Sequence, residues 1–329
     1  MNNHLSDGQG REINYLRVSV TDRCNLRCAY CMPPSGVELY PKCDILQYRE
    51  LLTIIESFAE LGVKKIRVTG GEPLVRKGVV GFIQQVSEIV GIQEIAITTN
   101  GIQLHKMAGE LKNAGVSKVN ISLDTLIPER FKTITGFDGF NQTMHSIHSA
   151  ISSGFESVKI NMVVIDGVND DEIEDFVRLS VDMPVQVRFI EFMPATPQVW
   201  DESKLVPMDK VKEKVERIGK LVVCGRSRWG GPAEIYRLEG AKGEIGFISA
   251  VTRHFCSDCN RLRVNSKGKL LTCLFGSDDL DLKELVQSGA DKEKIKKAIQ
   301  TVVLGKNDIR TMIANGDSTR GEAMSCVGG

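Results

Sequence analysis

The chain has no excess of either charge, because 42 lysines and arginines balance 42 aspartates and glutamates over 329 residues. This balance excludes a general attraction to nucleic acid or to an acidic membrane surface, so any anion site must be local. No apolar run is long enough to span a bilayer. The first ten residues are polar and carry neither an apolar signal core nor an arginine-rich amphipathic stretch. We therefore expect a cytoplasmic protein that binds neither nucleic acid nor a membrane.

Low-complexity segments are also absent, and the chain has no tandem repeat beyond a strand–helix rhythm. Hydrophobic residues make up 42% of the chain and charged residues 26%, as in an ordinary soluble globular protein. The length allows one or two domains. Nine cysteines in a compartment expected to be reducing indicate metal binding rather than disulfides.

Three of these cysteines lie within eight residues, directly after an expected strand. They are Cys24, Cys28 and Cys31. Soft thiolates at this spacing can hold one face of a compact metal centre, and three of them leave one iron of a four-iron, four-sulfur (4Fe-4S) cluster open to another ligand. A zinc site needs a fourth ligand, and no histidine lies between Cys31 and His105. The spacing favours an iron–sulfur cluster over zinc, and a disulfide is less favoured than either.

Hydrophobic periodicity predicts strands that alternate with helices over the first part of the chain. The expected strands are 14–20, 64–69, 94–100, 117–124, 157–165 and 185–192. The expected helices are 48–61, 79–90, 102–114, 141–153 and 170–181. Parallel neighbours need helical crossovers, so this order predicts a mostly parallel sheet. Since a closed barrel needs eight units, we predict an α/β fold with an open, partial (β/α)6 barrel, similar to an incomplete TIM barrel.

One face of every expected strand is polar. The bases on this face that we expect to give an enclosed space a positive charge are Arg17, Arg67, Lys159 and Arg188. Because the covering helices need the apolar face, the polar face must line the interior, where the bases would make a cavity positive. Ion pairing is an equal alternative for any single base, but a weaker one for the set of four. The carboxylates available for such pairing are Glu72, Asp124 and Glu191.

A turn with paired glycines, residues 69–73, follows the second strand. Paired glycines allow a close approach of the backbone to a ligand, and ligands of α/β folds bind at the carboxyl ends of strands. Ser122 ends the fourth strand and Met193 follows the sixth, so both would meet the same ligand. An ordinary turn and a core methionine remain open as alternatives.

After Pro194 the rhythm breaks, which predicts a core domain of residues 1–195 and a β-rich extension of residues 196–329. The extension should contain helices near 208–218, 280–288 and 291–303. Its expected strands are 220–224, 234–238, 244–249, 261–265 and 269–273.

The extension carries a second cysteine triplet. It consists of Cys256, Cys259 and Cys273. On spacing alone, zinc with His254 as fourth ligand is an equal alternative to a cluster. Arg261 and Arg263 follow on one strand face, and arginine forks suit phosphate oxygens, although exposed strand arginines are common. The combination predicts a metal site beside a phosphorylated substrate.

The chain ends in Gly328 and Gly329. A terminus of this kind often frays. Two residues without side chains could also enter a narrow cavity.

The C-x3-C-x2-C run, with Tyr30 before its last cysteine, resembles the signature of radical S-adenosylmethionine (SAM) enzymes. The resemblance implies that SAM fills the open iron. It also implies that a reduced cluster cleaves SAM to a 5′-deoxyadenosyl radical, which takes a hydrogen from a substrate. In such enzymes the cofactors carry the chemistry, and the protein positions them.

Taken together and in this order, the two triplets, the glycine turn, the arginine pair and the terminal glycines resemble the GTP 3′,8-cyclase family of molybdenum cofactor biosynthesis. The resemblance covers essentially the whole chain and implies a second 4Fe-4S cluster on the second triplet, with its open iron at the guanine base. The implied GTP contacts are Arg17, Arg67, Thr98, Lys159, Arg261 and Arg263. The implied SAM contacts are Tyr30, Gly71, Ser122 and Met193. Catalytic roles are implied for Arg17, Gly328 and Gly329.

The same resemblance implies three partners: a reductant of the flavodoxin or ferredoxin type, a downstream cyclic pyranopterin monophosphate synthase, and a second copy in a homodimer. Residues 305–323 depart from the basic stretch typical of the family, so no role is predicted for them. Two other functions remain open. One is a radical SAM enzyme that modifies peptides and carries an auxiliary cluster. The other is a metal- or cluster-binding scaffold or electron-transfer protein that consumes no SAM.

Overall fold

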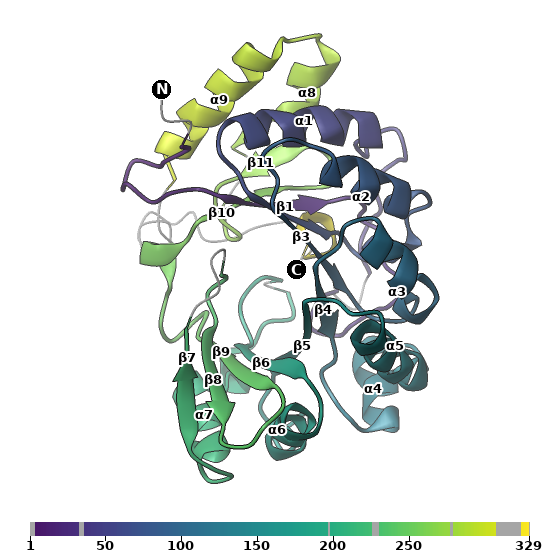
Figure 1. The fold of residues 1–329 in the computed structure, drawn as a ribbon, viewed down its shortest axis with the longest axis vertical. Coiled ribbons are helices and arrows are strands. Elements are labelled where there is room, and N and C mark those ends of the chain that lie inside the picture. The colour runs from purple at the N-terminus through teal and green to yellow at the C-terminus, as the bar shows by residue number, and fades with distance from the viewer. Residues whose placement is uncertain are drawn as a thin grey trace.

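The computed structural model describes residues 4–32, 36–196, 198–225, 230–276, 279–306 and 324–328. These residues contain one continuous sheet of twelve strands, in the order β12-β11-β10-β1-β2-β3-β4-β5-β6-β9-β8-β7. The sheet curves around an interior, and most helices lie on its outer side (Figure 1). The arc is open, because β12 and β7 are its two ends and do not pair with each other.

The six predicted parallel strands are confirmed. They are β1 (Tyr15–Ser19), β2 (Lys65–Thr69), β3 (Glu94–Thr99), β4 (Lys118–Ser122), β5 (Ser157–Val164) and β6 (Val185–Glu191). The helices between them are α1 (Tyr48–Glu60), α2 (Val79–Ser87), α3 (Leu104–Asn113), α4 (Pro128–Thr135), α5 (Phe140–Ser152) and α6 (Ile173–Asp182). Helix α4, which is short, is not among the helices predicted from the sequence. Its local signals are Pro128 in the first turn and Gly136, left-handed at φ 68°, at its end.

The strands of the C-terminal extension join both edges of the parallel sheet. On the β6 side lie β9 (Glu244–Ile248), β8 (Glu234–Leu238) and β7 (Leu221–Cys224). On the β1 side lie β10 (Arg261–Val264), β11 (Lys269–Leu271) and β12 (Leu280–Asp281). Since β9 is parallel to β6 and β10 to β1, eight consecutive strands are parallel, and the outer strands are antiparallel. The division between residues 195 and 196 stays a prediction.

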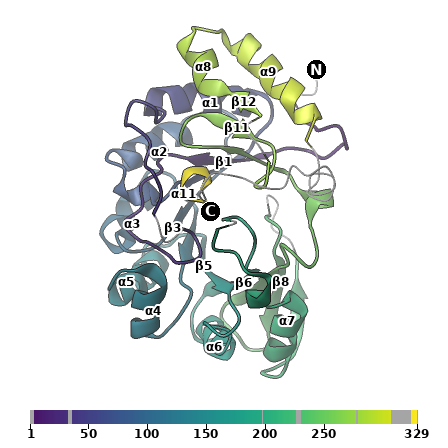
Figure 2. The same ribbon diagram turned by 180° about the vertical axis from the view of Figure 1, so that it is seen from behind.

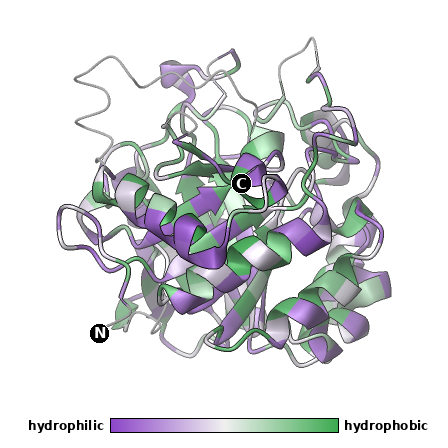
Figure 3. Ribbon diagram, turned by 90° about the horizontal axis from the view of Figure 1, so that it is seen from above, coloured by the Kyte–Doolittle hydropathy of each residue, from purple (hydrophilic) through white to green (hydrophobic). Residues whose placement is uncertain are grey.

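Alternation within the strands separates the core from the interior. In β1, Leu16 and Val18 face the helices and are fully buried. Helix α1 packs its apolar stripe against this side and ends at Glu60, and Gly62, two residues later, adopts the left-handed conformation at φ 100°. Figure 3 shows hydrophilic and hydrophobic segments alternating along the helices. Each large apolar side chain buried in this layer contributes about 1.5–3 kcal/mol.

The other α-helices in the described residues are α7 (Met208–Glu216), α8 (Leu282–Gln287), α9 (Lys292–Leu304) and α11 (Met324–Val327). Helix α11 lies inside the arc, near its centre, in both views (Figures 1 and 2). There Cys326 and Val327 pack against Leu271 of β11. In the described part of the chain, no helix has the length and apolar character needed to cross a membrane.

Candidate functional site

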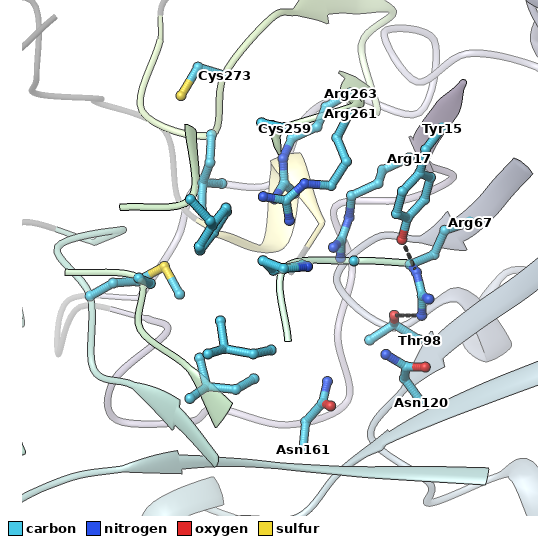
Figure 4. Close-up of a pocket in the computed structure, with 18 of the residues that line it drawn as sticks. Tyr15, Arg17, Arg67, Thr98, Asn120, Asn161, Cys259, Arg261, Arg263 and Cys273 are labelled. Carbon is cyan, nitrogen blue, oxygen red and sulfur yellow. Dashed lines mark hydrogen bonds between the residues drawn. The ribbon is translucent and has the colours of Figure 1, made fainter. Parts of the chain in front are cut away.

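A cavity of about 190 Å³ lies inside the arc, and the polar strand faces form much of its wall. Its lining includes Tyr15, Arg17, Lys65, Arg67, Thr98, Asn120, Lys159, Asn161, Arg188, Arg261 and Arg263. Figure 4 shows the side chains of Arg17, Arg261 and Arg263 projecting into this space. The predicted polar interior is confirmed, and the six residues expected to contact GTP all line one cavity.

The strand register explains why the bases gather there. Tyr15 of β1 is aligned with Lys65 of β2 on one side and Arg261 of β10 on the other. Arg17 is likewise aligned with Arg67 and Arg263. Because aligned residues of neighbouring strands share a face, pairing β10 with β1 brings arginines from opposite ends of the chain together.

Tyr15 is the phenol at the centre of this basic group. Its hydroxyl accepts a hydrogen bond from Arg67 Nε, and Arg67 Nη1 donates to Thr98 Oγ1 at 3.2 Å (Figure 4). Burial alone would raise the pKa of Tyr15, but the charges of Arg67, Arg17 and Lys65 lower it to about 7. The phenol therefore orients Arg67 and moderates the positive charge around it.

The carboxylates considered as ion-pair partners are bound elsewhere. Glu72 accepts hydrogen bonds from the backbone N–H groups of Leu74 and Asn100, at 3.0 and 2.7 Å. Asp124 accepts from the hydroxyl of Tyr30 at 2.7 Å. Glu191 accepts from three backbone N–H groups, those of Met208, Val251 and Thr252. These carboxylates thus cap backbone turns and do not neutralise the cavity.

In the described ranges, Arg67, Lys159 and Arg188 make no ion pair. Burial, followed by the charges of Arg188 and Arg67, lowers the pKa of Lys159 to about 5. A cavity this rich in unneutralised bases is built for a polyanion. An anionic ligand would restore the charge of Lys159.

The first cysteine triplet lines a second cavity, of about 220 Å³. The four residues expected to contact SAM, namely Tyr30, Gly71, Ser122 and Met193, line it too. The two cavities share wall residues. These are Thr98, Asn161, Ile190, Met193 and Met324. A ligand in one cavity would therefore lie beside a ligand in the other.

The glycine turn packs directly against the segment before Cys24. A Cβ on Gly71 would lie 2.5 Å from the carbonyl oxygen of Arg23, and one on Gly70 would lie 2.6 Å from that of Thr21. The N–H of Gly71 donates to Thr21 O at 2.8 Å. No other residue type fits this approach, so the glycines fix the turn to the first cysteine loop.

The second triplet lines the first cavity, beside the arginines. Burial would raise the pKa of Cys259, but Arg261 and Lys306 lower it to about 6. His254, the proposed zinc ligand, donates from Nδ1 to the carbonyl of Ala250 at 3.2 Å. Among the described residues, no three His, Cys, Asp or Glu side chains surround one metal-ion position. In the described residues, this arrangement gives no support to a single zinc ion at the second triplet.

The described part of the tail enters the same region. Arg263 Nη1 donates to the carbonyl oxygen of Gly328 at 2.6 Å. Gly328 is left-handed at φ 78°, and a Cβ there would lie 2.4 Å from Thr69 Cγ2. Met324 lines both cavities. That Gly328 and Gly329 enter a cavity stays a prediction: the described tail residue that lines both cavities is Met324, and Gly329 lies outside the described residues.

The sequence analysis assigned no role to several side chains of the site. Tyr15, Asn120 and Asn161 line the cavity, and their positions on the polar strand face could have indicated it. Lys306, which donates to the carbonyl oxygen of Thr272 beside the second triplet, had no local signal. Its position depends on how α9 packs.

Known proteins resemble both halves of the chain. Residues 18–180 match the Radical SAM superfamily, and residues 185–312 match Molybdenum Cofactor Synthesis C. A crystal structure of Streptococcus suis SuiB bound to precursor peptide SuiA has a TM-score of 0.61 and 15% identity, and covers 98% of this chain and 70% of that one. At this identity the likeness shows the fold alone. With the cysteine loop and its cavity, the fold defines a radical SAM enzyme.

Relatives of higher sequence identity identify the family within this class. A GTP 3′,8-cyclase of Thermodesulfovibrio yellowstonii is 46% identical over 297 residues, which cover 90% of this chain and 92% of that one. A GTP 3′,8-cyclase of Geobacter sulfurreducens is 43% identical over 325 residues, which cover 99% of both. This chain belongs to the GTP 3′,8-cyclase family, whose members act in molybdenum cofactor biosynthesis. The peptide-modifying and non-enzymatic alternatives are set aside.

Proposed function

We propose that the chain converts GTP to (8S)-3′,8-cyclo-7,8-dihydroguanosine 5′-triphosphate, the first step of molybdenum cofactor biosynthesis. In this reaction the ribose loses its 3′ hydrogen and C3′ bonds to C8 of guanine. One electron and one proton then complete the product. The observation that carries the proposal is the pair of adjoining cavities, each lined by one cysteine triplet and sharing a wall at Thr98 and Met193. This arrangement would hold the two reactants side by side.

The second cavity is the proposed site for the first 4Fe-4S cluster and S-adenosyl-L-methionine. Cys24, Cys28 and Cys31 would hold three irons, and Tyr30, Gly71, Ser122 and Met193 would contact SAM. When bound, these groups would supply a carbon-centred radical for hydrogen abstraction. The chain's own part is to fix the cysteine loop. The N–H groups of Arg27 and Ala29 donate to the carbonyls of Thr135 and Ile134 at 2.8 and 2.9 Å.

The first cavity is the proposed GTP site. Cys256, Cys259 and Cys273 would hold a second 4Fe-4S cluster next to the base. The contacts to GTP would come from Arg17, Arg67, Thr98, Lys159, Arg261 and Arg263. The buried guanidinium groups would bind the phosphates as two-pronged donors, which sets the ribose relative to the other cavity.

Arg17, Gly328 and Gly329 are proposed to act at the reacting centre. Arg17 lies between Arg67 and Arg263 in the register, and Arg263 holds the carbonyl of Gly328. A docked tail would keep water out of the wall that the two cavities share. Its loss should lower turnover more than folding.

Three partners belong to the proposal. The reaction consumes electrons, so a flavodoxin- or ferredoxin-type reductant is required, and the product would pass to a cyclic pyranopterin monophosphate synthase. We also propose a cytoplasmic homodimer, with residues 1–195 as the radical SAM domain and residues 196–329 as the substrate-binding extension.

The test is anaerobic assay of the reconstituted full chain with SAM, a reductant and GTP. We expect 5′-deoxyadenosine and the cyclised nucleotide to form in equal amounts and only with GTP. A Cys24→Ala variant should lose both products, whereas Cys43→Ala, which changes an exposed cysteine outside both cavities, should keep them. Formation of 5′-deoxyadenosine at the same rate with a peptide in place of GTP would refute the assignment.

A further inference from the structure

The N-terminal segment forms a short hairpin against the end of α9. Leu5 and Ile13 are joined by a backbone hydrogen bond of 2.8 Å, and Asp7 Oδ1 accepts from the N–H of Arg11 at 2.9 Å. The N–H of Gly8 donates to the carbonyl oxygen of Leu304, and a Cβ on Gly8 would lie only 2.5 Å from that oxygen. The hairpin directly precedes β1 in the chain and is seated closely on the end of α9, which comes from the other end of the sequence.

Arg11 extends from this hairpin to two distant segments. Its Nε donates to Asp7 Oδ2 at 2.5 Å, its Nη1 to the carbonyl oxygen of Cys256 at 2.6 Å, and its Nη2 to the carbonyl oxygen of Lys306 at 2.9 Å. The side chain is only 8% exposed, and that of Asp7 is fully buried. At this buried position each of the three guanidinium nitrogens of Arg11 has a hydrogen-bond acceptor, so the side chain is held in one orientation.

The two backbone carbonyls that accept hydrogen bonds from Arg11 connect it to both segments that carry the second triplet. The Cys256 carbonyl also accepts from the N–H of Cys259 at 3.2 Å, which closes the turn between these two cysteines. The Lys306 side chain donates to the carbonyl of Thr272, the residue before Cys273. One guanidinium thus connects the Cys256–Cys259 turn to the segment that carries Cys273, through a single intervening lysine.

We propose that Arg11 is a positioning residue for the second cysteine triplet, which it assembles before any metal is bound. The bracket formed by Asp7, Arg11 and Lys306 holds the Cys256–Cys259 turn and the Cys273 segment at a set separation. None of the three thiols lies on a strand, and apart from this bracket the Cys259 and Cys273 segments are joined by the antiparallel pairing of β10 with β11. The proposal rests on the proposed function only in naming a 4Fe-4S cluster as the occupant.

Lysine cannot replace arginine in this role. Its single ammonium lacks the planar fork that reaches two carbonyls and a carboxylate together. We expect Arg11→Lys to keep the pairing with Asp7 and to lose at least one of the two bridges. The first triplet lies in the other cavity and should not respond.

The first experiment counts iron and sulfide in the full chain after anaerobic reconstitution. Wild type should hold about eight irons per chain, and Arg11→Lys and Arg11→Ala about four. Both variants should still cleave SAM reductively, yet form less than a tenth of the wild-type cyclised product. The matched control is Arg253→Ala, because Arg253 lies in the same loop but is exposed and pairs only with exposed Asp209 at 3.0 Å. It should hold about eight irons, as wild type does.

The second experiment uses no cluster. In the full chain with Cys24, Cys28 and Cys31 changed to alanine, a trivalent arsenical reports how well the second triplet is assembled. Its affinity should fall about tenfold or more with Arg11→Lys and stay unchanged with Arg253→Ala, because ligands held in place in advance bind more tightly. This arm tests Arg11 even if wild type holds only about four irons, a result that would count against the proposed second cluster alone.

Several results would overturn the proposal. Arg11 variants that keep wild-type iron and arsenical affinity would show that the bracket is dispensable. Equal loss with Arg253→Ala would make the effect a general one of the loop. Loss of both clusters together, with a lowered melting temperature, would assign Arg11 to overall stability.

Discussion

The docked tail offers the sharpest test of the site, through Gly328→Ala. Gly328 contacts two strands of the sheet: Arg263 of β10 donates to its carbonyl at 2.6 Å, and the side chain of Thr69, at the end of β2, lies against its Cα. At φ 78° the position is left-handed, and the new methyl group would lie 2.4 and 2.6 Å from Thr69 Cγ2 and Oγ1. Neither the backbone nor the neighbour accepts alanine without movement.

The size of the effect follows from two costs. A left-handed alanine costs about 1–2 kcal/mol. Forcing a methyl group into a packed wall costs about 1–3 kcal/mol. The docked state is then disfavoured by roughly 2–5 kcal/mol, which is a factor of about 30 or more in the docking equilibrium. When the tail leaves, its hydrogen bond to buried Arg263 is lost as well.

The assay is GTP cyclisation, with SAM cleavage and the melting temperature measured in parallel. Gly328→Ala should lower cyclisation at least about tenfold. It should leave the melting temperature unchanged, because the tail is a terminal segment. The matched control is Gly240→Ala. Gly240 has the same φ of 78°, but a Cβ there meets nothing within 4 Å, so the backbone strain arises away from the site. Wild-type cyclisation by Gly328→Ala, or an equal loss with Gly240→Ala, would refute the reasoning.

Three further changes test the two cavities. The pKa of Lys159 is about 5 without ligand, and bound GTP phosphates should raise it, so GTP binding should take up a proton. The affinity for GTP should therefore fall as the pH rises above 5. Calorimetry in two buffers should show this proton uptake in wild type and not in Lys159→Met. Tyr15→Phe removes the hydroxyl that accepts a hydrogen bond from Arg67 Nε, and it should raise KM for GTP about tenfold with little change in kcat. The control is Tyr236→Phe, outside both cavities, which should change neither constant. Tyr30→Phe removes the hydrogen bond to Asp124 and should raise the SAM requirement about tenfold without changing GTP affinity, as steady-state titration of each substrate would show.

Much of the barrel was predictable because its signals are local. Alternation marks each strand, helical spacing marks α1, and Gly62 marks the end of that helix in both sequence and structure. The helix that was missed, α4, has only eight residues and so presents little periodicity. The polar strand face was visible in sequence as well, since it follows from parity alone.

Which strands pair with each other had no comparable local signal in the sequence. Nothing in residues 261–264 indicates that β10 joins β1 as a parallel edge strand, and nothing in residues 244–248 indicates that β9 joins β6. The same holds for Arg11, whose carbonyl partners lie 245 and 295 residues away. Contacts at such separations arise only once the sheet and α9 are packed.

By itself, the sequence determined the chemistry of this protein: which thiols, arginines and glycines are present, and which strand face carries them. Spacing within one segment sets the geometry of Cys24, Cys28 and Cys31, because a short loop allows few arrangements. Only the tertiary structure decided that Arg263 lies beside Arg17, that the two triplets line adjoining cavities, and that Gly328 meets Thr69. The physical reason is that strand order and register are set by the burial of whole faces, a property of the assembled sheet rather than of any one segment.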